Sequence, residues 1–367
     1  MTTALASASI PASTSVKTPQ LSLAAAQAQF GGGHGYLAAC TMGLPTRDTI
    51  QAQHADLDRA YHTGTDCAVY EAAVAAGRAS YARLVGVSTD RVAIGSQESV
   101  MAGVIAASAP DGAEIVCIDG DFSSIIFPFL QQQHRGVHVR HVPQDAVAES
   151  VTERTWLVAF SLVQSATGVI ADADTIIAAA ARTGTRTLCD LTQAAGWLPV
   201  DASKFDATIG HAYKWLSAPR GVAFMTVSQD FAGRLRPVQA GWYAGDDPWT
   251  STYGPNMHLA DDARRFDVSP AWQSWIGAAP ALDMYASLDM QEVAAYDIAL
   301  GDALCEGLGL TTRGQSIVTW HDPDGDQLAR LTGAGIVASG RAGNARVAFH
   351  LWNDESDVDA VLRALGR

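Results

Sequence analysis

One lysine in this sequence lies where an amine could do chemistry. The chain has only three lysines, and two of them, Lys17 and Lys204, fall in a polar tail and a turn. Lys214 instead stands between Tyr213 and Trp215, just after the apolar run ATIG. An amine in an aromatic, partly dry site has a lowered pKa and can act as a nucleophile or form a Schiff base. A lysine that only passes an indole on its way to solvent would leave the same pattern.

An aspartate upstream of this lysine suggests a cofactor. Asp190 ends the apolar run RTLCD and opens the segment DLTQ. A carboxylate at one strand end, facing a lysine from the next, is the pair that pyridoxal phosphate (PLP) requires, because the lysine holds the aldehyde and the carboxylate keeps the ring nitrogen protonated. Gln193 could donate a hydrogen bond to the phenolic oxygen. Asp190 could equally serve as a helix N-cap.

These side chains need a scaffold that brings strand ends together. Short apolar runs alternate with helical patterns, which predicts an α/β domain with a mostly parallel sheet and a site at the carboxyl ends of its strands. The predicted strands are Arg91–Gly95, Glu114–Ile118, Val137–Val142, Trp156–Phe160, Arg186–Asp190, Ala207–Gly210 and Gly221–Val227. The predicted helices between them include Tyr70–Leu84, Val100–Ala107 and Ala173–Thr183.

The pattern changes after residue 240 and predicts a second, smaller α/β domain. An aromatic, glycine-rich and proline-rich loop precedes a predicted helix, Trp272–Leu288. Predicted strands follow at Ile317–Trp320, Gly335–Ser339 and Ala345–Leu351, with a last helix from about Glu355. We therefore divide the chain into a disordered tail (1–28), a segment packing on the small domain (29–50), a large domain (51–270) and a small C-terminal domain (271–367).

The composition excludes several classes of protein. Hydrophobic residues make up 48% of the 367 residues, which is ample for a folded core. The net charge of -14 argues against nucleic-acid binding, and no apolar run reaches the ~18 residues of a membrane helix. The five cysteines form no CxxC pair, so we predict no metal site. We predict no signal peptide and expect a cytoplasmic enzyme.

Taken together, three motifs resemble the class V aminotransferase family, the cysteine desulfurase-like and kynureninase-like branch of the fold type I PLP enzymes. They are D-x-x-Q (Asp190, Gln193), the lysine segment HAYKW and the C-terminal RVAFHLWN. The resemblance covers roughly residues 35–360. It implies a large domain with a mostly parallel seven-stranded sheet, a smaller C-terminal α/β domain, PLP as cofactor, and a homodimer with shared active sites.

The resemblance also implies roles for single residues on the phosphate side of the cofactor. The Ser96 hydroxyl and the backbone N–H groups of Gln97 and Glu98 would hold the phosphate at a helix N-terminus. A carboxylate repels a phosphate, so we expect the Glu98 side chain to turn away, and it has no assigned role. His211 and Tyr213 would reach the phosphate as well. A plain turn with a helix cap and structural hydrogen bonds remain the alternatives.

Further residues would complete the site. Phe122 would stack on the cofactor ring, with Phe127 as its competitor, and Ser165 would border the ring. From the second subunit, Ser269 and, less directly, Trp242 or Tyr243 would complete the phosphate site. The resemblance places Lys214 as the imine-forming base, and Arg346 as the group that binds the substrate α-carboxylate. Core packing, loop packing and a surface ion pair are the corresponding alternatives.

The reaction depends on which bond at the substrate breaks. Cysteine desulfuration needs a nucleophilic cysteine shortly before the arginine, and no cysteine lies between Cys305 and Arg346, unless Cys40 or Cys67 moves in. A β-elimination needs only proton abstraction and a leaving group. We therefore predict a C–S lyase acting on an S-substituted cysteine or its sulfoxide. Its products would be pyruvate and ammonia.

Other reactions of the family stay open beside this prediction. The chain is similar to the actinobacterial lyases of the hercynylcysteine sulfoxide type, which implies ergothioneine or sulfur-containing natural-product biosynthesis. The alternatives are a class V aminotransferase, an oxidative deaminase, a kynureninase-type reaction and a desulfurase-like enzyme. The predicted partners are a small amino-acid substrate and a second copy of the chain, with no nucleic acid and no membrane.

Overall fold

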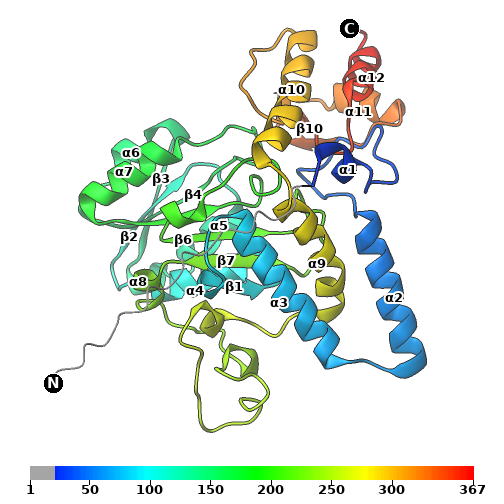
Figure 1. Ribbon diagram of the computed structural model, residues 1–367. Helices are drawn as coiled ribbons and strands as arrows, with labels where there is room; N and C mark the ends of the chain where they lie inside the picture. The colour runs from blue at the N-terminus through cyan, green and yellow to red at the C-terminus, as the bar shows by residue number, and fades with distance from the viewer. Residues whose placement is uncertain (1–20) are drawn as a thin grey trace, which may run out of the picture.

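A seven-stranded sheet forms the centre of the large domain in the computed structural model, which describes residues 21–367. Its place among the surrounding helices can be followed in Figure 1. The strand order is β1-β7-β6-β5-β4-β2-β3, and only β7 runs antiparallel to its neighbours. This confirms the predicted α/β class and mostly parallel sheet. The strands are β1 (Val92–Gly95), β2 (Glu114–Ile118), β3 (His138–Val142), β4 (Thr155–Ser161), β5 (Arg186–Asp190), β6 (Ala207–His211) and β7 (Ala223–Val227).

The central strands are apolar along their whole length because both faces of the sheet are covered. Alternate residues of β2 show this: Val116 and Ile118 belong to one buried core, and Ile115 and Cys117 to another. The first core is shared with α3 (Cys67–Leu84), α6 (Val147–Ser150), α7 (Ala173–Thr183) and α9 (Trp272–Ala286). The second is shared with α4 (Glu98–Ser108), α5 (Ser123–Leu130) and α8 (Gln229–Ala232).

The second sheet is small and antiparallel, in the order β8-β10-β9. Its strands are β8 (Ile317–His321), β9 (Ser339–Arg341) and β10 (Asn344–Ala348), and its helices are α10 (Met290–Leu308), α11 (Asp326–Gly333) and α12 (Glu355–Leu365). The strand predicted at 335–339 is displaced toward Arg341. The reason is that Val337 pairs with Tyr36 of the N-terminal segment instead.

Helix α9 connects the two parts of the molecule and packs on the large-domain side (Figure 1). A Cβ on Gly77 of α3 would lie 2.9 Å from the Trp275 ring of α9, so the two helices are in close contact. The Thr49 hydroxyl of α2 (Arg47–Thr63) donates to Gly277 O at 2.8 Å. Helix α9 therefore packs against α2 and α3 and leads on to α10.

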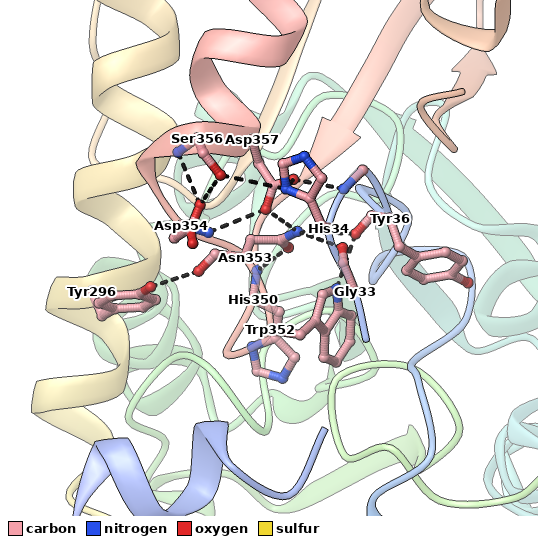
Figure 2. Close-up of polar contacts among 11 residues, drawn as sticks. Gly33, His34, Tyr36, Tyr296, His350, Trp352, Asn353, Asp354, Ser356 and Asp357 are labelled. Atoms are coloured by element: carbon pink, nitrogen blue, oxygen red, sulfur yellow. Dashed lines mark hydrogen bonds and ion pairs between the residues drawn. The ribbon is translucent and has the colours of Figure 1, made fainter. Parts of the chain in front are cut away.

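The N-terminal segment is anchored to the small domain at the start of α12 (Figure 2). Gly35 N donates to Asp357 Oδ1 at 2.6 Å, and Asn353 Nδ2 donates to Gly33 O and Tyr36 O at 3.3 and 3.2 Å. The Asp357 oxygens also accept from Asn353 Nδ2 and Asp354 N, so this carboxylate serves as a helix cap. The anchor fixes the course of the chain into residues 40–43, which reach the site.

The predicted disordered tail, residues 1–28, falls mainly outside the described residues. The last part of this predicted tail is ordered instead. Leu23–Gln27 form the short helix α1, and the Ser22 side chain caps its N-terminus. Within residues 21–367, no helix is long and apolar enough to cross a membrane.

Candidate active site

The predicted lysine and aspartate meet at the carboxyl edge of the sheet. Asp190 is the last residue of β5, and Lys214 follows the end of the neighbouring strand β6 by three residues. Parallel strands bring such positions to one edge. The Lys214 side chain is only 7% exposed, and its Nζ lies 5.5 Å from the centre of the Phe122 ring and 5.8 Å from that of Tyr213. The amine therefore faces aromatic rings in a largely dry site.

Burial dominates the electrostatics of this pair. It lowers the pKa of Lys214, while the through-space charges of Asp190 and Glu98 partly oppose that shift. Burial, and next the charge of Glu98, raise the pKa of Asp190 above its ordinary value. A neutral amine is therefore more accessible here than on a surface lysine, as proton abstraction at carbon requires.

A backbone N–H holds one carboxylate oxygen of Asp190, and the other oxygen makes only a long hydrogen bond. Asp190 Oδ1 accepts from Thr192 N at 2.7 Å, and within residues 21–367 its Oδ2 has only the Ser161 hydroxyl at 3.5 Å. Ser161 is itself held by Asp121, which accepts from its N–H at 2.9 Å and from its hydroxyl at 2.6 Å. The carboxyl group is thus oriented, with room for one more donor at Oδ2.

The N-terminus of α4 lies beside His211. Ser96 lies in the turn that leads from β1 to α4, and the N-cap residue Gln97 makes no capping hydrogen bond with its side chain. The N-cap side chain thus does not occupy the first N–H groups of the helix, where an anion could bind. One of them is already used, since Glu98 N donates to His211 Nε2 at 3.2 Å. The Glu98 side chain turns inward to the protein interior, where it is completely buried.

Phe122 rather than Phe127 is the aromatic residue at the lysine. Phe127 is 60% exposed on the outer side of α5, whereas Phe122 is half-buried at the start of that helix and faces Lys214. Gln193 is also nearby but largely engaged: its Nε2 donates to Cys40 O at 2.9 Å and its Oε1 accepts from Trp215 Nε1 at 2.7 Å. One amide hydrogen of Gln193 remains for a ligand.

Arg346 is a buried cation on β10 held by neutral groups. Its side chain is 2% exposed, and its guanidinium donates to Ser339 Oγ at 3.1 Å, to Thr41 Oγ1 at 3.0 Å and to Ser165 O. No carboxylate within residues 21–367 forms an ion pair with it. A buried guanidinium without a counter-ion is costly and marks a site for an anion. Ser165 thus enters the site through its backbone, as a partner of this arginine.

The residues assigned to a second subunit do not contact this lysine in their own chain. Ser269 is exposed and follows Val268, whose N–H donates to Ile94 O at 3.4 Å. Trp242 packs against Tyr243 and Trp249, with ring centres 5.2 and 5.3 Å apart. Nothing in these contacts joins them to Lys214.

The sequence did not reveal the N-terminal contribution to the site. Gly43 N donates to Tyr213 O at 2.9 Å, and a Cβ on Gly43 would lie 2.0 Å from Lys214 O. Thr41 contacts Arg346, and the Cys40 charge would influence the pKa of both Lys214 and Arg346. A glycine, a threonine and a cysteine in a loop carry no recognisable motif, so only the three-dimensional structure could place them here.

The small domain also contacts the lysine segment through a buried histidine. His350 Nε2 lies 2.9 Å from Trp215 O and 2.9 Å from the Tyr285 hydroxyl, and its Nδ1 lies 2.8 Å from Asp297 Oδ2. Because these bonds join α9, α10 and the end of the small sheet to the residue after Lys214, both domains determine where the lysine lies.

Comparison with known proteins agrees with this geometry. A family model described as "Aminotransferase class-V" matches residues 62–324, more than half of the chain. The relatives include an isopenicillin N epimerase of Amycolatopsis lactamdurans, 28% identical over 60% of this chain and 62% of its own length, which is less than two thirds of that protein. A kynureninase of Deinococcus radiodurans is 28% identical over 72% of this chain and 70% of its own length.

Solved structures show the same fold. The cystine C–S lyase C-DES, in complex with its reaction product cysteine persulfide, superposes with a TM-score of 0.82 at 20% identity. The match covers 90% of this chain and 97% of that one.

Proposed function

The chain belongs to the class V aminotransferase family, and on that premise we propose that it is a PLP-dependent C–S lyase acting on an S-substituted cysteine or its sulfoxide, releasing pyruvate and ammonia. One observation carries the proposal. A buried amine at Lys214 and a buried guanidinium at Arg346, without a carboxylate partner in residues 21–367, share one site. Such a pair suits the α-carboxylate and the Cα proton of an amino acid.

The residues around Lys214 fit PLP, the cofactor of this family. Lys214 would hold the aldehyde, and the free side of Asp190 Oδ2 would receive the ring N–H. Phe122 would cover a ring face, and the N–H groups in the first turn of α4 that His211 does not occupy would hold the phosphate. When bound, PLP supplies an electron sink for the pair released as a bond to Cα breaks.

The side chains around the cofactor would then determine which bond of the substrate breaks. The fork of Arg346 would hold the substrate carboxylate in a bidentate manner and so orient the Cα–H bond. Lys214, whose pKa burial lowers, would take the Cα proton as a neutral amine. Loss of a sulfur group from Cβ requires no further side chain. This is why β-elimination suits a segment, residues 306–345, that contains no cysteine.

Product analysis tests the proposal. The purified, PLP-loaded protein is incubated with a panel of S-substituted cysteines and their sulfoxides, and products are identified by mass spectrometry, with Lys214→Ala as the inactive control. Pyruvate formed without an added keto acid would support the lyase. Conversion of the cofactor to pyridoxamine phosphate would instead establish a transaminase or oxidative deaminase, and an inverted Cα centre would establish an epimerase.

A second candidate, cysteine desulfuration, is favoured by the place of Cys40. This buried thiol lies close enough to influence the pKa of both Lys214 and Arg346. Alanine formed from cysteine, together with a persulfide on Cys40 in the intact protein mass, would establish this reaction. Cys40→Ser should abolish both, whereas Cys67→Ser, a change at the half-buried start of α3, should not.

We further propose a homodimer in which Ser269 and Trp242 of the second subunit complete the phosphate site. Supporting it, exposed apolar side chains gather on α2 (Leu57, Tyr61) and in the loop after residue 245 (Trp249, Tyr253, Met257). Surfaces of this kind are typical of interfaces. Light scattering gives the mass in solution. A monomer that binds PLP and remains active would refute the shared site.

A further inference from the structure

The Glu98 carboxyl group is a buried charge that the proposed function does not use. It belongs to the first residue of α4 and is 0% exposed. Its Oε2 accepts from the Thr192 hydroxyl at 3.3 Å, and its Oε1 has no hydrogen-bond partner within residues 21–367. An unpartnered buried carboxylate oxygen costs free energy. A functional role of Glu98 would explain why the protein carries this cost.

The histidine beside it, His211, is a weak source of positive charge. Its Nε2 accepts from Glu98 N at 3.2 Å and also lies 3.3 Å from the Gln97 amide oxygen. The first contact fits a neutral ring, whose second nitrogen is Nδ1. That atom lies 3.4 Å from Glu98 Oε2 without hydrogen-bond alignment. Burial, which lowers the pKa of His211, favours the same neutral form.

The other charges around Glu98 are mostly negative. Asp190 at the end of β5 and Asp121 after β2 are buried carboxyl groups, and Lys214 after β6 is the cation that acts on Glu98. Arg220, in the turn before β7, acts on His211 instead. A charged Glu98 therefore depends on Lys214 and on the positive end of α4. These are the groups that a phosphorylated cofactor would engage.

We propose that Glu98 is a proton-coupled positioning residue: when an anionic group binds at the N-terminus of α4, Glu98 takes up one proton from solvent and remains buried as a neutral acid. The inference rests on the PLP site proposed above. Two anions at one helix end in a dry site repel strongly, and protonation removes that repulsion. The new O–H can also satisfy a neighbouring acceptor, which a carboxylate cannot do.

The protonation is accessible near neutral pH. Burial raises the pKa of Glu98 to about 7, with Lys214 and Thr192 opposing the shift. At pH 8, above this pKa, the carboxyl group is mainly ionised, so most of a proton remains to be taken up there. Because cofactor binding would then consume a proton, cofactor affinity should fall as the pH rises above 7.

Calorimetry counts the protons directly. Apoprotein is titrated with PLP at pH 8 in two buffers of different ionisation enthalpy, and the difference in heat gives the number of protons bound. We expect Glu98→Gln, which keeps the shape but cannot titrate, to take up roughly one proton fewer than the wild type. Above pH 7 the ratio of wild-type to variant Kd should rise up to about tenfold per pH unit.

Two further variants sharpen the result. Glu114→Gln is the matched control, because Glu114 begins β2 at the opposite edge of the sheet, bonded to Thr155 and paired with Arg140. It should behave as wild type. Thr192→Val removes the hydrogen bond that favours the Glu98 anion, so the apoprotein should hold more of the proton already and take up less. If Glu98→Gln does not fold, the proton uptake of Thr192→Val still tests the role of Glu98.

The outcomes separate the two proposals. PLP binding with equal proton uptake in wild type and Glu98→Gln, or an affinity loss that is the same at every pH, would overturn the role of Glu98 alone. The expected difference without any pyruvate formation would overturn the lyase alone. A wild-type protein that does not bind PLP would overturn both.

Discussion

Replacing Arg346 by glutamine should cut kcat/KM for an amino-acid substrate sharply while changing the stability of the fold little. Removing one partner of a buried, hydrogen-bonded charge pair costs about 2–5 kcal/mol. At about 1.4 kcal/mol per decade, that is a loss of roughly thirty-fold to several-thousand-fold.

The stability of the variant follows from the neutral surroundings of Arg346. The guanidinium donates to Thr41 Oγ1, Ser339 Oγ and Ser165 O, and each such bond contributes about 1 kcal/mol. Against this, an unpaired buried cation costs several kcal/mol of lost hydration. These contributions have opposite sign and similar size, so the free energy of unfolding should change by no more than about 1–2 kcal/mol.

Arg78 is the matched control because it is a buried arginine that does have a counter-ion. Its Nη2 lies 2.6 Å from Asp267 Oδ2, which is also buried. Arg78→Gln would leave that carboxylate unpaired, and breaking a buried pair costs about 3–5 kcal/mol. The two variants should therefore differ clearly in stability.

The assay combines chemical denaturation of the apoprotein with the kinetics of product formation, or with the spectral change of bound cofactor on adding an amino acid. The reasoning would be refuted if Arg346→Gln kept kcat/KM within threefold of wild type. It would also be refuted if this variant lost as much stability as Arg78→Gln, since Arg346 would then be a structural residue.

Three further changes test the rest of the site. Lys214→Ala should abolish turnover and the visible absorbance of bound PLP without unfolding the protein; an unchanged spectrum would remove the central assignment. Gly43→Ala places a Cβ 2.0 Å from Lys214 O. The free energy of unfolding should therefore fall by about 1–3 kcal/mol, and kcat should fall as well. Unaltered denaturation and kinetics would contradict the close approach of Gly43 to Lys214. Phe122→Ala should weaken PLP binding by about 0.5–1.5 kcal/mol of ring stacking, up to roughly tenfold in Kd measured by fluorescence titration. Phe127→Ala, at an exposed position, should leave that Kd unchanged, and an equal effect of both would refute the assignment.

Local sequence patterns were sufficient to predict the strands of the large domain. Each strand of the central sheet is a short apolar run bounded by turn residues, and such runs are recognisable because both faces of a parallel sheet are buried. The strand predicted at 335–339 shows the limit of this reading. Whether Val337 pairs within the small sheet or with Tyr36 depends on a segment 300 residues away, which no local pattern records.

The same contrast holds for the site. The aspartate at the end of β5 and the lysine after β6 could be found from the sequence. Each lies at or just after the end of a predicted strand, and parallel strands end at the same edge of the sheet. The fate of the Glu98 side chain could not be found in this way. A carboxylate next to a helix start is normally solvated, and only the packing of His211 and Thr192 around it shows that it is buried.

By itself, then, the sequence determined the sheet, the family resemblance and the reactive pair Asp190 and Lys214, because these depend on residue type and on short-range order along the chain. Only the tertiary structure decided that residues 40–43 contact the lysine segment and Arg346, and that no carboxylate of the described residues pairs with this buried arginine. It also decided that Glu98 turns inward. These features arise where the N-terminal segment, the small domain and the sheet edge meet, and contacts between distant segments depend on how whole elements pack.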